Sequence, residues 1–181
     1  MKNAFFCTLL ACIIFTRAAN AQSSFNEDRM YDLVSLGLGL GFDYGGIGGN
    51  IIVYPQKNIG LFFGGGYAIV GFGYNAGIKL RLVRESHAVD PFFVGMYGYN
   101  AVVYVPDNTQ YNKIFYGPTF GAGIDLHKRG ASLGYWTFAI MVPIRNSEVK
   151  NYMDKLHNNY GISLSSLFPV GISVGYKFTL N

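Results

Sequence analysis

The sequence predicts an all-β fold: an eight-stranded antiparallel up-and-down transmembrane β-barrel with a short helix in the loop before the last strand. Apolar and small polar residues alternate with a period of two along most of the chain, which is the pattern of strands with two different faces. Only 13% of the residues are charged, against the roughly 25% of an ordinary soluble domain. The 24 glycines, 15 phenylalanines and 14 tyrosines suit strands with one small face and one apolar face.

The first 21 residues have the pattern of a secretory signal peptide. Lys2 supplies the positive n-region, residues 4–15 form an apolar run, and Ala19-Asn20-Ala21 is a small-x-small cleavage site. We therefore expect cleavage before Gln22 and one mature domain, residues 22–181. An N-terminal membrane anchor is disfavoured because the apolar run is shorter than the roughly 20 residues that span a bilayer as a helix.

Both cysteines, Cys7 and Cys12, lie in this leader segment. The mature domain is then expected to have no disulfide, no thiolate nucleophile and no cysteine metal site. The stretch Leu9-Leu10-Ala11-Cys12 also resembles a lipoprotein signal, in which Cys12 would be lipidated. The apolar run continues through residues 13–15, which favours ordinary cleavage over lipidation.

Eight strands joined mostly by short turns are expected after the leader. In strand one, residues 32–44, an apolar face runs from Val34 to Phe42. Strands two, three and five alternate less cleanly and are placed partly from turn signals such as Gly45-Gly46. The expected lengths are close to the 9 to 11 residues that a tilted strand needs to cross a bilayer. The remaining ranges are 47–55, 59–68, 72–83, 91–105, 113–126, 131–144 and 171–181.

The one long connection, residues 145–168, precedes the last strand. Apolar residues recur in it at helical spacing behind Ser147 as a candidate N-cap, which predicts a short amphipathic helix. The helix either contacts an extracellular ligand or only covers the barrel mouth. The candidate contact residues are Tyr152, Met153, His157 and Tyr160.

Two kinds of barrel could use such strands, and they differ in which face meets the solvent. A soluble lipocalin-like barrel would keep its apolar face inside and needs a charged outer face. The second face here is mostly glycine and serine, so the sequence favours a barrel whose apolar face meets lipid and whose small polar face lines the interior. Closure then requires the last strand to pair with the first, because an unpaired backbone group in hydrocarbon costs several kcal/mol.

The last residues resemble a known assembly signal. Gly175, Phe178 and Leu180 have the spacing of the C-terminal β-signal of bacterial outer-membrane proteins, although Asn181 follows and Leu180 replaces the usual Phe. The chain from residue 32 onward resembles the small eight-stranded outer-membrane barrels of the OmpA/OmpX type. DYGGIGGNIIVYPQKNIGLF and FYGPTFGAGIDLH also resemble uncharacterised outer-membrane β-barrel proteins of Bacteroidota.

The resemblance implies a location and a set of partners. The protein would lie in the cell outer membrane as a monomer with both termini periplasmic, surrounded by outer-membrane lipid after insertion by the barrel-assembly machinery. With that topology, four charged side chains share the lower interior: Lys79, Arg81, Asp125 and Lys177. Charges in a narrow lumen are costly unless they are paired, so we expect an ion-pair network centred on Asp125. It would plug the barrel or line a gated ion path, and narrow eight-strand interiors favour the plug.

The sequence contains no recognisable catalytic pattern. His87, His127 and His157 are scattered and have no serine or carboxylate at a spacing that predicts a pair. We expect no cofactor, no metal and no enzyme activity. Without Lys2 and Arg17 the chain carries 12 basic and 10 acidic residues, so its charge gives no indication of nucleic-acid binding. A structural or surface-interaction role in the envelope is favoured, and a narrow conduit and a lipid-modifying enzyme stay open as alternatives.

Overall fold

The computed structural model describes residues 33–82, 88–106, 108–127, 134–162 and 167–180. The expected signal peptide, both cysteines, His87 and Asn181 lie outside the described residues. Within the described ranges, no helix is long and apolar enough to cross a membrane.

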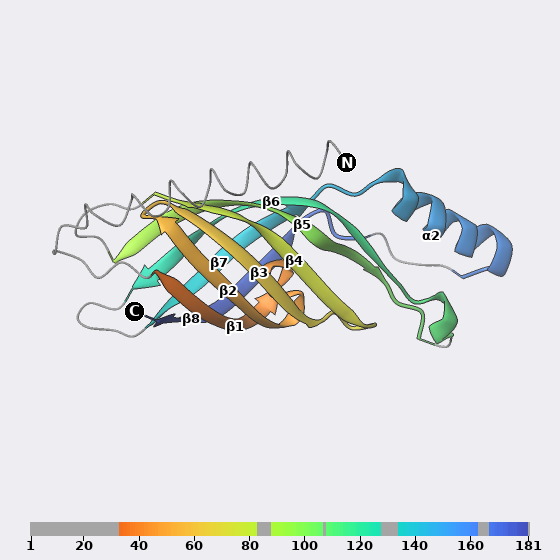
Figure 1. Cartoon of the computed structure of the whole chain (residues 1–181). Helices are drawn as coiled ribbons and strands as arrows, with labels where there is room; N and C mark the ends of the chain where they lie inside the picture. Colours follow the sequence, from red (N-terminus) through yellow and green to blue (C-terminus); the bar gives the residue numbers. More distant parts are fainter. Residues whose placement is uncertain (1–32, 83–87, 107, 128–133, 163–166, 181) are drawn as a thin grey trace, which may run out of the picture.

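Eight antiparallel strands close into a barrel (Figure 1). Each strand pairs with its sequence neighbours, and β1 pairs with β8. The predicted all-β, eight-stranded, antiparallel up-and-down barrel with a helix before the last strand is therefore confirmed. The strands are β1 Val34–Gly41, β2 Gly46–Gln56, β3 Ile59–Tyr67, β4 Phe72–Arg81, β5 Val89–Val103, β6 Lys113–His127, β7 Gly134–Pro143 and β8 Gly171–Leu180.

The seam between β1 and β8 is a regular antiparallel ladder. Leu36 lies opposite Phe178, Gly37 opposite Lys177 and Leu38 opposite Tyr176. This ladder gives the backbone groups of both outer strands partners, so the sheet has no open edge. The expectation that the last strand closes the barrel against the first is thus confirmed.

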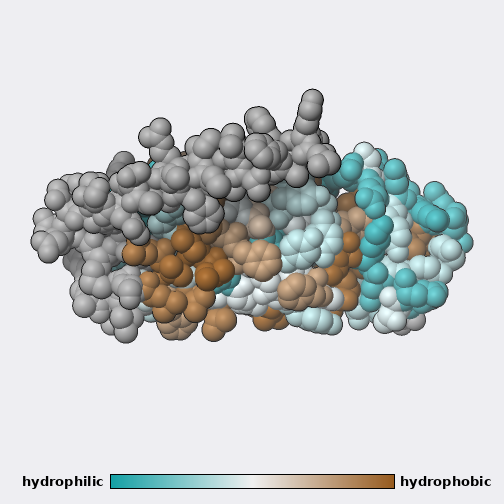
Figure 2. Space-filling view, viewed as in Figure 1, coloured by the Kyte–Doolittle hydropathy of each residue, from teal (hydrophilic) through white to brown (hydrophobic). Residues whose placement is uncertain are grey.

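Large apolar side chains cover the outside of the barrel. Leu38 is 64% exposed, Ile140 60% and Ile172 71%. Figure 2 shows hydrophobic residues over the barrel and hydrophilic residues at the end that carries α2. The strand period of two then sends the intervening residues inward, where Asn75, Thr119 and Asp125 are fully buried.

The β5–β6 hairpin extends past the barrel toward α2 (Figure 1). Its register shifts between Tyr99 and Ala101, which makes Asn100 the extra residue of a β-bulge. The Asn100 amide donates hydrogen bonds to Pro118 O at 2.9 Å and to Thr119 Oγ1 at 3.1 Å. A short 3-10 turn, η3 (Thr109–Tyr111), lies at the tip of this hairpin.

The helix α2 (Ser147–Tyr160) packs on this extension. Val149 and Leu156 from the helix and Phe115 from β6 belong to a second apolar core, separate from the one inside the barrel. The predicted N-cap was wrong by one residue. Asn146 has the extended conformation of the cap and makes no side-chain capping bond, whereas Ser147 is already helical.

Strand one ends earlier than predicted. After Gly41 the chain forms a 3-10 turn, η2 (Phe42–Tyr44), that folds into the barrel. Phe42 was expected on the lipid face, but it packs against the inner apolar core, and Tyr44 is fully buried. The reason is conformational: Gly41 (φ 130°) and Gly45 (φ 69°) adopt backbone angles that turn the chain inward and that other residues rarely adopt.

Candidate functional site in the barrel interior

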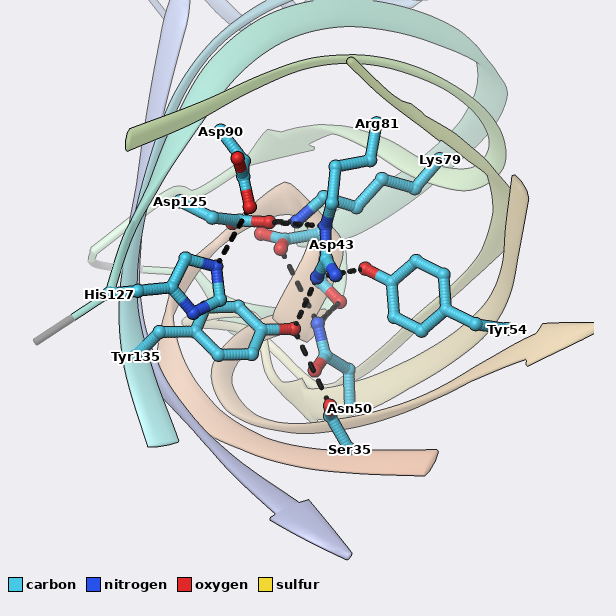
Figure 3. Close-up of polar contacts among 10 residues, drawn as sticks. All are labelled: Ser35, Asp43, Asn50, Tyr54, Lys79, Arg81, Asp90, Asp125, His127 and Tyr135. Atoms are coloured by element: carbon cyan, nitrogen blue, oxygen red, sulfur yellow. Dashed lines mark hydrogen bonds and ion pairs between the residues drawn. The ribbon is translucent and has the colours of Figure 1, made fainter. Parts of the chain in front are cut away.

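Two cations on β4 reach the same carboxylate on β6. Lys79 Nζ lies 2.8 Å from Asp125 Oδ1, and Arg81 Nε lies 3.1 Å from Asp125 Oδ2. Each of the three residues is at most 3% exposed. Figure 3 shows them pointing toward one another inside the barrel from β4 and β6, which are separated in the wall by β5. Both carboxylate oxygens thus accept a charge-assisted hydrogen bond, the strong kind in proteins.

Aromatic side chains hold the two cations in place. Arg81 Nη2 donates to Tyr54 Oη at 2.6 Å and to Tyr135 Oη at 2.9 Å. The Arg81 guanidinium carbon also lies 4.2 Å from the centre of the Tyr54 ring, and Lys79 Nζ lies 3.7 Å from the centre of the Phe92 ring. These contacts add cation–π attraction to the ion pairs. Arg81 therefore links β2, β4, β6 and β7.

Lys177 faces the same lumen and is 2% exposed. Its register partners are Gly37 on β1 and Tyr135 on β7. Of the four residues expected in the network, the structure brings Lys79, Arg81 and Asp125 into direct contact. Lys177 lies in the interior beside them.

A second polar group lies at the same end of the barrel, and sequence reasoning missed it. Asp90, on β5, is opposite Asp125 in register and is 3% exposed. Its Oδ2 lies 3.3 Å from His127 Nε2, and the His127 ring stacks on Tyr135 with centroids 4.6 Å apart. His127 lies one residue beyond the predicted strand 113–126, but it is the last residue of β6. Alternation in β5 with Phe92 and Val94 could have placed Asp90 inside.

The buried charges balance. The buried ionisable side chains in the described part of the chain include three cations and three carboxylates. This balance lowers the cost of keeping charges away from water. The three cations are Lys79, Arg81 and Lys177, and the three carboxylates are Asp43, Asp90 and Asp125.

The rest of the lumen is more apolar than predicted. An inner core from β2, β3, β5 and β7 includes Ile52, Phe62, Met96 and Met141, all at most 7% exposed. Strands two, three and five alternated poorly in the sequence because parts of both their faces are apolar. The interior is thus lined by small polar residues on some strands and filled by large apolar ones on others.

The four loop candidates divide into two pairs. Tyr152 donates its hydroxyl to Tyr111 O at 2.8 Å, and Met153 packs against the second apolar core. Both therefore help to fasten α2 to the hairpin. His157 is exposed and Tyr160 is 52% exposed, with its ring 4.8 Å from that of Tyr111.

The three residues of the candidate assembly signal lie on both faces of β8. Gly175 faces inward, and a Cβ there would lie 2.2 Å from Tyr44 Oη. Phe178 and Leu180 face outward and are 47% and 48% exposed.

These features define a closed eight-stranded antiparallel barrel with an apolar exterior and a charged, filled interior. No protein-family model matches the chain, and no curated protein matches it. Among solved structures, it is similar to the N-terminal β-barrel domain of Pseudomonas aeruginosa OprF, with 12% identity and a TM-score of 0.45 over 80% of this chain and 96% of that domain. A likeness at this level carries no inference about function.

Proposed function

We propose that the protein is an integral outer-membrane β-barrel with a closed interior and a structural or surface-interaction role in the cell envelope. The observation that carries the proposal is the distribution of side chains. Leu, Ile, Val and Phe side chains cover the outer wall at 37–71% exposure, while six charged residues are buried inside. A soluble barrel requires the reverse arrangement, and hydrocarbon is the solvent that suits this one.

The signal-peptide pattern and the resemblance of two segments to Bacteroidota outer-membrane proteins support this location. The two ends of the barrel differ from each other. α2 and the β5–β6 extension lie at one end, and the C-terminal ends of β4, β6 and β8 lie at the other. In outer-membrane barrels the longer loops face outward. We therefore assign α2 to the cell surface and the Arg81–Asp125 end to the periplasm.

Membrane fractionation with heat-modifiable gel mobility tests the proposal. The protein is expected in the outer-membrane fraction and to migrate faster unheated, because the closed barrel resists unfolding by detergent. Recovery in the soluble periplasmic fraction would end the membrane assignment. The control is a known periplasmic protein followed in the same fractions.

The filled lumen supports the closed interior rather than a conduit. We expect no stable single-channel conductance in planar bilayers, because Arg81 links β2, β4, β6 and β7 across the lumen and the inner apolar core fills the space beside it. The Asp125→Asn variant is recorded in parallel. A stable conductance whose size changes in this variant would replace the plug with an ion path.

Surface recognition through α2 is the specific role that the outer end supports. Removing residues 150–159 takes away the exposed His157 and most of the helix, whereas the barrel ladder contains none of these residues. We expect unchanged heat-modifiable mobility and lost binding of an extracellular partner in a cell-surface binding assay. The control variant Tyr152→Phe removes only the hydroxyl that holds Tyr111 O. Impaired barrel folding in the deletion would instead mean that the helix is a structural cover.

A lipid-modifying enzyme is the competing class, and we infer that the protein is not one. The Asp90–His127 contact is the one histidine–carboxylate approach in the described ranges, and it faces the lumen. A lipid substrate would have to reach a catalytic pair from the membrane. A lipid A profile of a deletion strain decides the matter, since a changed profile that returns with the wild-type gene would revive the enzyme.

A further inference from the structure

The connection between β1 and β2 folds into the barrel mouth. The Tyr44 ring lies against glycines of β1 and β8: a Cβ at Gly39 would lie 2.7 Å from Tyr44 Cζ, and one at Gly175 would lie 2.2 Å from Tyr44 Oη. The ring thus occupies a space that exists because these wall positions have no side chain. Removing the ring from this position would leave a hollow lined largely by backbone.

Few polar contacts hold this turn in the lumen. Asn50 Nδ2 donates to Asp43 O at 3.2 Å and to Asp43 Oδ2 at 3.4 Å, both at the long end of hydrogen-bond distances. Asn75 Nδ2 donates to Phe42 O. An apolar contact also holds the turn, because Phe42 packs on the inner core and its ring lies 5.3 Å from that of Tyr99.

Buried oxygens in and beneath the turn lack protein partners. Asp43 Oδ1, Tyr44 Oη and Asn50 Oδ1 are all buried and make no hydrogen bond to protein within the described part of the chain. Such groups are costly to keep from water. Opening the turn would let water satisfy these three oxygens, whereas the closed position keeps the apolar packing of Phe42 and the attraction between Asp43 and Lys177.

Glycines at both ends allow the turn to move as a unit. Gly41 has a φ of 130° and Gly45 a φ of 69°, conformations that glycine reaches without steric cost. Asp43 and Tyr44 between them are not part of the strand ladder. A change at these two glycines would swing the turn outward and leave the β1–β2 ladder from Val34 to Leu40 in place.

We propose that residues 42–45 form a lid, which lifts and admits water and small hydrophilic solutes to a vestibule lined by Asn50, Asn75 and Ser173. The lid lies at the α2 end of the barrel, and the Arg81–Asp125 contact lies toward the opposite end. The vestibule is therefore a pocket that ends at the ion pairs and not a through-channel. The inference rests on the proposed outer-membrane location only for the side from which solutes enter.

Cysteine modification tests the lid in the full mature chain, which has no cysteine from residue 22 onward. Ser173→Cys places a thiol under the lid, and Ser35→Cys places one in the interior at the opposite end of β1 from the lid; the two residues are 1% and 0% exposed. The probe is a positively charged, membrane-impermeant methanethiosulfonate reagent, applied to the purified folded protein. We expect Ser173→Cys to react at least tenfold faster than Ser35→Cys.

Gly45→Ala is a second, independent test, because the substitution destabilises the closed position of the lid. A Cβ at Gly45 would lie 2.3 Å from Gly73 O, so the substitution should drive the turn out and raise the Ser173→Cys rate a further tenfold. Gly161→Ala is the matched control, since Gly161 has a φ of 68° and nothing within 4 Å of an added Cβ. It imposes similar backbone strain far from the lid and should leave the rate unchanged.

Equal rates for Ser173→Cys and Ser35→Cys would overturn the lid, and so would an unchanged Ser173→Cys rate in a folded Gly45→Ala protein. If Gly45→Ala does not fold, the ratio of the two single cysteine variants still decides the question. The ratio is measured on the fraction that holds the folded barrel. A soluble barrel would refute the outer-membrane location, while the ratio would separately decide the lid.

Discussion

Replacing Asp125 with Asn is expected to lower the free energy of unfolding of the barrel by about 3–5 kcal/mol. The carboxylate is fully buried and pairs with both Lys79 and Arg81. The amide keeps the shape but leaves two buried cations without a counter-charge at this position. Denaturant titration of the folded barrel in detergent micelles, followed by gel mobility, measures the loss.

Glu148→Gln is the matched control for this loss. It also removes one carboxylate from an ion pair, but Lys113 and Glu148 have side chains that are 42% and 63% exposed. Exposed pairs contribute about 0–1 kcal/mol, so the variant should unfold almost like the wild type. Adding Lys79→Met to Asp125→Asn should recover part of the lost stability, because one uncompensated cation disappears. An Asp125→Asn protein as stable as the wild type would show that the network does not hold the barrel together.

Replacing Leu38 with Arg should impair membrane insertion and cost about 2–4 kcal/mol if the residue lies near the bilayer midplane. Leu38 is 64% exposed in the middle of β1, so the arginine would point into hydrocarbon. The measurement is the fraction of protein that folds into lipid vesicles, read from heat-modifiable mobility, together with denaturant titration of the folded part.

The effect of Leu38→Arg on folding distinguishes a membrane barrel from a soluble barrel. In a soluble barrel, an exposed Leu38→Arg change would be neutral or would improve solubility. Asn151→Arg is the control, since Asn151 is exposed on α2 outside the barrel wall, and it should fold into vesicles as well as the wild type. Efficient insertion of Leu38→Arg would contradict the outward orientation of β1 toward lipid.

The alternation of strands such as β6 and β8 made their faces readable in the sequence. Successive side chains of a strand point alternately into and out of the barrel, because the side-chain period of a strand is two. Once Phe178 is placed on the outer face, its neighbour Lys177 must therefore point inward, as it does in the structure. The same rule places Lys79 and Arg81 on one face of β4. Antiparallel topology then brings this face toward Asp125, which is why the centre of the network could be expected without coordinates.

Other parts of the interior could not be read from the pattern. Tyr54 and Tyr135 contact Arg81 from strands that are far from it in sequence, and only the register of a closed barrel specifies that approach. Asp90 was missed because strand five was predicted to begin at Pro91, whereas the pairing of Asp90 with Asp125 and of Val89 with Leu126 begins β5 at Val89.

The sequence by itself determined the eight strands, their faces and the closed antiparallel order, since these depend on local periodicity and short turns. Only the tertiary structure decided what fills the barrel. The turn at Phe42–Tyr44 folds inward because the glycines of β1 and β8 leave room for the Tyr44 ring, and alternation alone would have continued Phe42 along the outer face. The space inside the barrel depends on the side chains of all eight strands together, so the pattern along one strand does not predict which side chains fill it.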